Sequence, residues 1–220
     1  LLIKNYLKME SNMNFFEVFE NLNSKILVHF NKLFIDKDRY FTGLIGEISL
    51  KKNIVDSAEI NSKINKKNIF SLTIKTNKKG EKITNLFIEE PEPFIKNYNF
   101  IKGFSEGRLS YGSIEKNNKI KANLKIYDFK VQKVPVLAKL LTLASLQGIA
   151  DLLTGEGIRF NEFEMDYETI QSDTKINEMY AIGPALSILM EGYIEKKKLI
   201  SLRGTLVPAT TINKTISKIP

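Results

Sequence analysis

The chain contains no cysteine, no tryptophan and a single histidine, His29. The absence of cysteine excludes disulfide bonds, thiol catalysis, thiolate zinc sites and iron–sulfur clusters. A serine nucleophile activated by histidine would have to use His29, which lies in the apolar run 26–30. A histidine in that setting is typical of a strand residue that faces solvent or is satisfied in a core. The sequence therefore offers no nucleophile paired with histidine.

Motifs that bind phosphate, cofactors or metals are also missing. The glycine pairs at 43/46, 103/107 and 155/157 fit neither the P-loop nor the dinucleotide-binding spacing, and no calcium loop is present. Carboxylates gather at 89–92, in a proline-containing connector, and at 162–166, where they alternate with Phe163, Met165 and Tyr167. That alternation is typical of the solvent face of a strand. We therefore predict a non-enzymatic protein with no catalytic residue, metal or cofactor.

The net charge of +8 would ordinarily suggest an anionic partner such as a nucleic acid or a membrane. Only four of the 33 basic residues are arginine, and the lysines are scattered or gathered in turns. Base recognition and bidentate phosphate contacts favour arginine. We therefore expect no nucleic-acid partner, and a salt-sensitive gel shift would overturn that expectation.

No stretch of the sequence has the composition of a membrane span. The most apolar run, 136–153, contains Lys139, Gln147 and Asp151. Because the chain begins at Leu1 rather than at a methionine, we expect it to be a fragment of a longer protein. A signal or anchor helix can therefore lie outside the fragment.

Short turns rich in lysine and asparagine divide the sequence into strand-like runs. They lie at 51–53, 65–68, 77–80, 116–119 and 195–198. Turns at such short and regular intervals are typical of an antiparallel meander. Between them apolar and polar residues alternate, most regularly over 119–131, where the phase slips at Asp128 and predicts a bulge or bend. Strands of this length predict a wide sheet rather than a compact sandwich.

Helical signals are few. The segment 137–153 is rich in leucine and alanine and is apolar on all sides, which predicts a short buried helix that plugs or caps the sheet, or else lies in a lipid surface. Gly148 is expected to interrupt this helix, and the glycines of 154–157 to end it. A second short helix is expected over 14–21. The acidic, proline-containing segment 89–93 is the best candidate for a boundary.

Two stretches carry a resemblance to a known family. The first, 139–160, reads KLLTLASLQGIADLLTGEGIRF; the second joins AIGPALSILMEGY at 181–193 to LISLRGTLVPATTIN at 199–213. Both resemble the C-terminal region of bacterial AsmA-like proteins of the YhdP type, in sequence and in order. The resemblance covers about 100–216 and divides the chain into a meander portion, 1–93, and an AsmA-like C-terminal region, 94–220, continuous with the same sheet.

The resemblance implies a fold, a location and a function. Members of this family are inner-membrane-anchored periplasmic proteins of Gram-negative bacteria that act in outer membrane biogenesis. Their long antiparallel sheet curls into an open, taco-like β-groove lined with apolar residues, which carries phospholipid toward the outer membrane. We therefore expect a mainly β fold with such a trough, phospholipid acyl chains as partners, and a membrane anchor outside the fragment.

One face of the predicted strands would then line the groove. The alternation of apolar residues assigns thirteen of them to this face: Phe70, Leu72, Ile74, Ile120, Ala122, Leu124, Ile126, Leu186, Ile188, Met190, Ile200, Leu202 and Leu206. The same pattern is compatible with a β-rich scaffold or outer-membrane assembly factor, in which these faces pack on protein and the rims or edges bind envelope protein partners. The sequence leaves both functions open.

Overall fold

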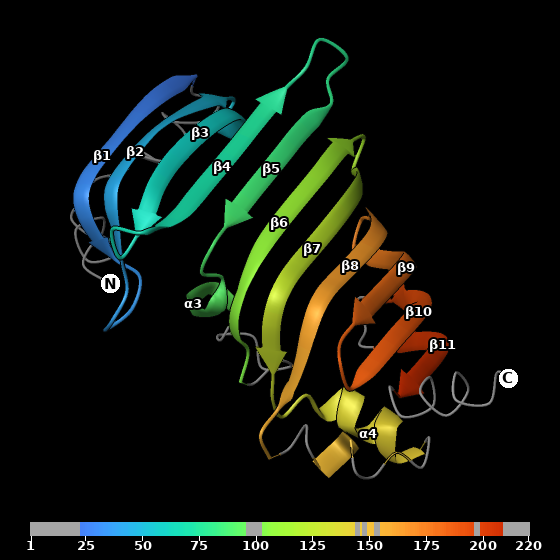
Figure 1. Cartoon of the computed structure of the whole chain (residues 1–220). Helices are drawn as coiled ribbons and strands as arrows, with labels where there is room; N and C mark the ends of the chain where they lie inside the picture. Colours follow the sequence, from blue (N-terminus) through green and yellow to red (C-terminus); the bar gives the residue numbers. More distant parts are fainter. Residues whose placement is uncertain are drawn as a thin grey trace, which may run out of the picture.

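The computed structural model describes residues 23–95, 103–143, 146, 149–151, 155–195 and 199–208. These residues form one eleven-stranded antiparallel sheet whose strands follow one another in chain order, so the predicted meander is confirmed (Figure 1). The fold is mainly β, and the sheet does not close into a barrel. The strands are β1 (Ser24–Phe34), β2 (Tyr40–Lys51), β3 (Ile54–Ile64), β4 (Asn68–Thr76), β5 (Lys82–Ile88), β6 (Ser105–Lys116), β7 (Lys119–Val131), β8 (Ile158–Ile170), β9 (Asp173–Ile182), β10 (Leu186–Ile194) and β11 (Ile200–Pro208).

The predicted lysine and asparagine turns are hairpin turns. Lys52 and Asn53 have φ of 50° and 60°, and Asn117 and Asn118 have the same two values. Two successive residues with left-handed backbone match the twist of the flanking strands, and asparagine tolerates this conformation. The turns at 65–68 and 77–80 also join consecutive strands. In the turn at 195–198, residues 196–198 lie outside the described residues.

The phase slip predicted at Asp128 is a kink in the sheet. Asp128 has a φ of 54°, and the facing residues of β6, Glu106 and Gly107, have φ of 64° and 87°. A Cβ on Gly107 would lie 2.9 Å from the Cβ of Phe129, so this position requires glycine. Beyond the kink Phe129 and Val131 are both buried, whereas strict alternation from Ile126 would have turned Asp128 inward.

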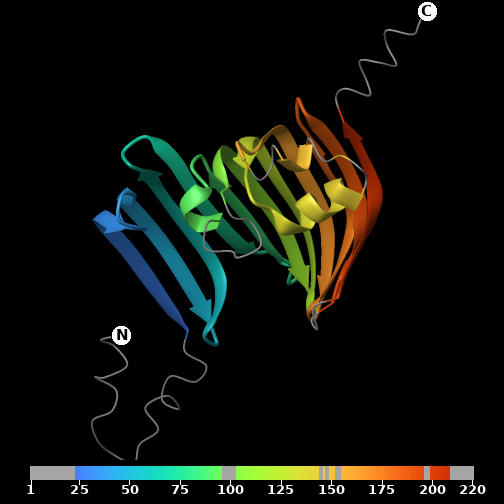
Figure 2. The same cartoon turned by 90° about the horizontal axis from the view of Figure 1, so that it is seen from below.

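Two described helices, α3 (Glu92–Ile95) and α4 (Pro135–Leu143), lie on the inner side of the bent sheet (Figure 2). The helix expected over 137–153 is shorter than predicted: α4 ends at Leu143, and of the described residues between 144 and 157 only 149–151 are again helical. Gly148, expected to interrupt it, lies outside the described residues, as does the helix expected over 14–21. Pro135 suits the first turn of α4 because its missing N–H would have no helical partner there.

The core lies where α4 meets the strand ends, and its members form a group that we call the end cluster. Leu141 of α4 has no exposed surface. The rings of Phe104 and Phe129 stack at 5.6 Å between centroids, and those of Phe129 and Phe160 at 5.5 Å. The end cluster comprises Phe104, Phe129, Leu141, Ile158, Phe160 and Leu186. The predicted apolar segment therefore covers one end of the strands, as expected for a cap.

The acidic connector does not interrupt the sheet. Strands β5 and β6, on either side of it, pair from Lys82 with Glu115 to Ile88 with Leu109. The connector leads into α3, whose Phe94 contacts two aromatic residues of the sheet. The ring centroids of Phe41 and Phe70 lie 4.8 Å apart, and the ring centroid of Phe94 lies about 6 Å from each. A single sheet thus spans both sides of the boundary expected at 93.

Candidate functional site

One row of residues crosses the whole sheet at right angles to the strands, and we call it the central row. Each member lies directly opposite the next, and directly opposed residues of antiparallel strands point to the same face. At ~4.8 Å between strands the row is about 48 Å long. Its members are apolar residues, glycines and one tyrosine: Val28, Gly46, Ile60, Leu72, Leu86, Tyr111, Leu124, Met165, Met179, Met190 and Gly204.

Two further rows flank the central row on the same face, which we call the inner face. One is apolar from β4 to β11: Phe70, Ile88, Leu109, Ile126, Phe163, Ala181, Ile188 and Leu206. The other row is apolar except near its middle, where it includes Thr84, Ser113 and Tyr167. Its members are Ile26, Ile48, Ala58, Ile74, Thr84, Ser113, Ala122, Tyr167, Ile176, Gly192 and Leu202. The inner face is therefore a continuous apolar surface.

All thirteen residues that the sequence assigned to a groove share this inner face. They come from β4, β7 and the adjacent pair β10 and β11, and strands that the prediction did not use lie between β4 and β7 and between β7 and β10. Leu186 is fully buried in the end cluster, so it belongs to the covered end rather than to the open part of the face. The prediction missed Ile60, Leu86, Tyr111, Met165 and Met179, although the alternation of Phe163 and Met165 with carboxylates already indicated that β8 has such a face.

The inner face is packed as a core along part of its width, where Ile88, Leu109, Ile126 and Ala181 are buried, and is more open along the central row. Leu72, Leu86, Leu124 and Met165 are each half-buried. Among the described elements no second sheet packs on this face, because each strand contacts chiefly its neighbours in the meander. Helices α3 and α4 cover only the part near one set of strand ends (Figure 2). An apolar surface of this extent that no second described sheet covers is typical of a binding surface.

The two rims of the sheet differ in their connections. The hairpin rim holds the turns that join β2 to β3, β4 to β5, β6 to β7, β8 to β9 and β10 to β11. The helix rim holds the remaining connections, including those that contain α3 and α4 (Figure 1). The meander thus places the turns at 51–53 and 77–80 on one rim and the turn at 65–68 on the other.

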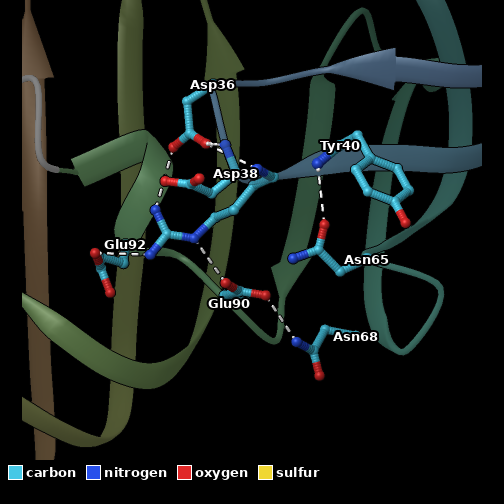
Figure 3. Close-up of polar contacts among 8 residues, drawn as sticks. Asp36, Asp38, Tyr40, Asn65, Asn68, Glu90 and Glu92 are labelled. Carbon is cyan, nitrogen blue, oxygen red and sulfur yellow. Dashed lines mark hydrogen bonds and ion pairs between the residues drawn. The ribbon is translucent and has the colours of Figure 1, made fainter.

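An arginine network fixes the helix rim (Figure 3). The Nε of Arg39 donates to Glu90 at 2.8 Å, and its other nitrogens lie 2.8 Å from Glu92 and 3.2 Å from Asp36. Burial lowers the pKa of Arg39, but these three carboxylates outweigh that effect and raise it. Glu90 also accepts a hydrogen bond from Asn68 at 2.8 Å. The network joins the β1–β2 loop to the connector that carries α3.

On β7 and β8 the opposite, outer face is polar and carries cross-strand ion pairs. Glu164 accepts hydrogen bonds from Tyr180 at 2.6 Å and Asn123 at 2.7 Å, and it lies 2.9 Å from the Nζ of Lys125. The Tyr180 hydrogen bond is the main cause that lowers the pKa of Glu164 to about 2, and Lys125 and Asn123 add to it. A carboxyl with so low a pKa stays ionised at neutral pH and does not serve as a general acid. The carboxylates at 162–166 therefore stabilise the outer face.

The remaining sequence candidates lie apart from the inner face. His29 is exposed on β1, opposite Ile45 of β2. In the part of the chain that the structure describes, no three residues among histidine, aspartate and glutamate are grouped so that they could hold a metal ion. No described helix combines the length and the apolar composition needed to cross a bilayer.

Comparison with models of protein families, with curated proteins and with solved structures found no match to this chain.

Proposed function

We propose that this sheet is a segment of a lipid-binding groove, in which the inner face shields phospholipid acyl chains from water. The observation that carries the proposal is the central row, which crosses all eleven strands with no charged residue. The outer face, by contrast, carries the ion pairs that suit it to solvent. A sheet with two such unlike faces, whose inner face the described helices cover only near one set of strand ends, is suited to an apolar ligand (Figure 2).

The lining also suits movement of lipid along the groove. Each acyl CH₂ removed from water contributes ~0.8 kcal/mol, so a ~16-carbon chain gains on the order of 12 kcal/mol on an apolar surface. A single strong site would trap the lipid, whereas aliphatic side chains repeated from strand to strand give a flat energy profile. The proposed function is transport without catalysis.

The resemblance to AsmA-like proteins of the YhdP type supports the same function and adds a location. It implies a segment in the periplasm, as part of a protein anchored in the inner membrane, with phospholipid carried between the inner and outer membranes. Location and direction of transport are part of the proposal and follow from the resemblance alone.

Site-specific photo-crosslinking tests the groove. A photoreactive residue is placed at Leu124 on the inner face or at its neighbour Lys125 on the outer face, in cells that express the full-length parent protein. The half-buried Leu124 is expected to crosslink to phospholipid and Lys125 is not. A second matched pair is Leu72 and Thr73 on β4. Equal crosslinking at both members of each pair, or at neither, would overturn the proposal.

A second candidate function is a scaffold that binds envelope proteins, and β1 is the observation that favours it. This strand lies at one end of the sheet, and large apolar side chains are exposed on both of its faces, with Leu27 74% and Phe30 46% exposed. Such an edge can accept a strand of a partner protein. Protein crosslinks from Leu124 in place of lipid would favour this function.

A further inference from the structure

The hairpin rim combines positive charge with exposed aliphatic side chains. The described residues of its five turns and their flanks, within 51–56, 75–82, 115–121, 168–175 and 195–199, include ten lysines and six carboxylates. The described residues of the helix-rim connections, within 35–40, 63–68, 89–105, 132–157 and 183–185, include seven basic and seven acidic residues. The excess of positive charge is therefore concentrated on the hairpin rim.

Part of this charge is neutralised within the rim. Lys51 pairs with Asp56 at 2.8 Å, Lys116 with Glu81 at 3.2 Å and Lys119 with Glu168 at 2.7 Å. Lys52, Lys78 and Lys79, at the tips of two turns, are exposed. Exposed lysines at turn tips can reach a charged surface that approaches the rim from outside.

Aliphatic residues lie beside the same turns. Ile54 follows the β2–β3 turn and is 62% exposed, and Ile170 precedes the β8–β9 turn and is 54% exposed. Leu199 and Ile200, beside the β10–β11 turn, are 51% and 53% exposed. Exposed lysines and exposed aliphatic side chains beside the same turns are typical of a protein surface that binds the headgroup region of a bilayer.

We infer that the hairpin rim docks on a membrane surface that contains anionic phospholipids, with the lysines contacting headgroups and the isoleucines entering the interface. The partner follows from the chemistry of the rim: positive charge without the arginines that nucleic-acid recognition favours, combined with apolar tips that a nucleic acid would leave exposed. The inference goes beyond the proposed function, because it concerns the rim rather than the inner face.

Vesicle co-sedimentation tests the inference. The probes are vesicles of phosphatidylcholine alone and vesicles of phosphatidylcholine with phosphatidylglycerol. The triple variant Lys52→Gln, Lys78→Gln, Lys79→Gln is compared with a matched variant of the helix rim, Lys63→Gln, Lys66→Gln, Lys67→Gln. Each lysine near an anionic surface contributes about fivefold in affinity, so the first variant should bind about 100-fold more weakly and the second like the wild type. Equal weakening in both variants would overturn the inference.

The apolar tips provide an independent variant pair. Ile54→Ser with Ile170→Ser should weaken vesicle binding even in high salt, where the lysine contribution is screened. Ile69→Ser with Ile182→Ser is the control, because Ile69 and Ile182 are 45% and 48% exposed beside turns of the helix rim. Unchanged binding by the Ile54 and Ile170 variant would overturn the inference, as would tighter binding of duplex RNA than of anionic vesicles by the wild-type rim.

The lipid crosslink at Leu124 separates this inference from the proposed function. Vesicle binding that depends on the hairpin rim, with no lipid crosslink at Leu124, would support membrane docking by the hairpin rim and contradict the lipid-binding groove. A lipid crosslink at Leu124 with vesicle binding that is indifferent to the hairpin rim would do the opposite.

Discussion

Lys125 and Glu164 lie directly opposite one another on β7 and β8, with 2.9 Å between the ammonium nitrogen and the nearer carboxylate oxygen. Their chain neighbours Leu124 and Met165 are also directly opposed, on the other face of the sheet. One pair of adjacent strands thus places an ion pair on the outer face and an apolar pair on the inner face. The predictions below use this difference between the faces.

Acid should remove the contribution of Glu164 to the free energy of unfolding. Its pKa is lowered to about 2 in the folded chain, so its stabilising effect is present above the unfolded pKa of about 4.5 and is lost as the pH falls toward 2. Glu164→Gln should lose about 1 kcal/mol of unfolding free energy at pH 7 and little at pH 2. Urea denaturation of both proteins between pH 7 and pH 2 measures this. A difference that is constant over the whole range would contradict the prediction.

Charge on the inner face should block lipid. Leu72→Lys places an ammonium in the central row, whereas Thr73→Lys places the same group on the outer face, opposite Glu59. Only the first variant is expected to abolish lipid crosslinking at Leu124, because the acyl chain would have to pass a charge in an apolar surface. Circular dichroism establishes that both variants remain folded. Normal lipid crosslinking in a folded Leu72→Lys variant would count against the groove.

Oxidation of three methionines on the inner face should also lower lipid binding. Met165, Met179 and Met190 lie directly opposite one another on β8, β9 and β10, in the central row. Oxidation converts methionine to a polar sulfoxide, so mild peroxide should lower lipid crosslinking at Leu124. Replacing all three by leucine should make the crosslinking resistant to peroxide. Equal sensitivity of that variant, which keeps Met9 and Met13, would show that these three residues are not responsible.

Loss of Arg39 should destabilise the helix rim. Its side chain is 19% exposed, and removing it leaves Glu90 and Glu92 without their common partner. Arg39→Ala is therefore expected to cost about 2–3 kcal/mol of unfolding free energy. Arg203→Ala is the control: that side chain is 85% exposed in its pair with Glu191, so its loss should cost less than about 1 kcal/mol. Similar losses in both variants, measured by urea denaturation, would contradict the prediction.

The sequence predicts the strands well because their determinants are local. The turns beside Asn53 and Asn118 need left-handed backbone that asparagine tolerates, and the alternation over 119–131 gives β7 its bounds and its kink. The face assigned to each predicted groove residue follows from the same alternation.

The features that the sequence did not predict are non-local. Arg39 and Glu90 are 51 positions apart, and no local pattern pairs them. The central row depends on the register of ten strand pairs, so Tyr111 and Met179 could not be placed in it from their own segments. The helix of the apolar segment 137–153 was expected to continue to an interruption at Gly148, because the composition of the segment does not reveal that α4 ends at Leu143.

Because the meander is unbroken, the length of the sheet across its strands can change in steps of one hairpin. Since every strand pairs only with its neighbours in the chain, duplicating or deleting two strands and a turn would leave the faces of all the others as they are. Each step would alter the length of the apolar surface by about 10 Å, twice the spacing between strands. A sheet built in this way can be lengthened or shortened by whole hairpins through gene duplication or deletion, without a change in the pairing of its other strands.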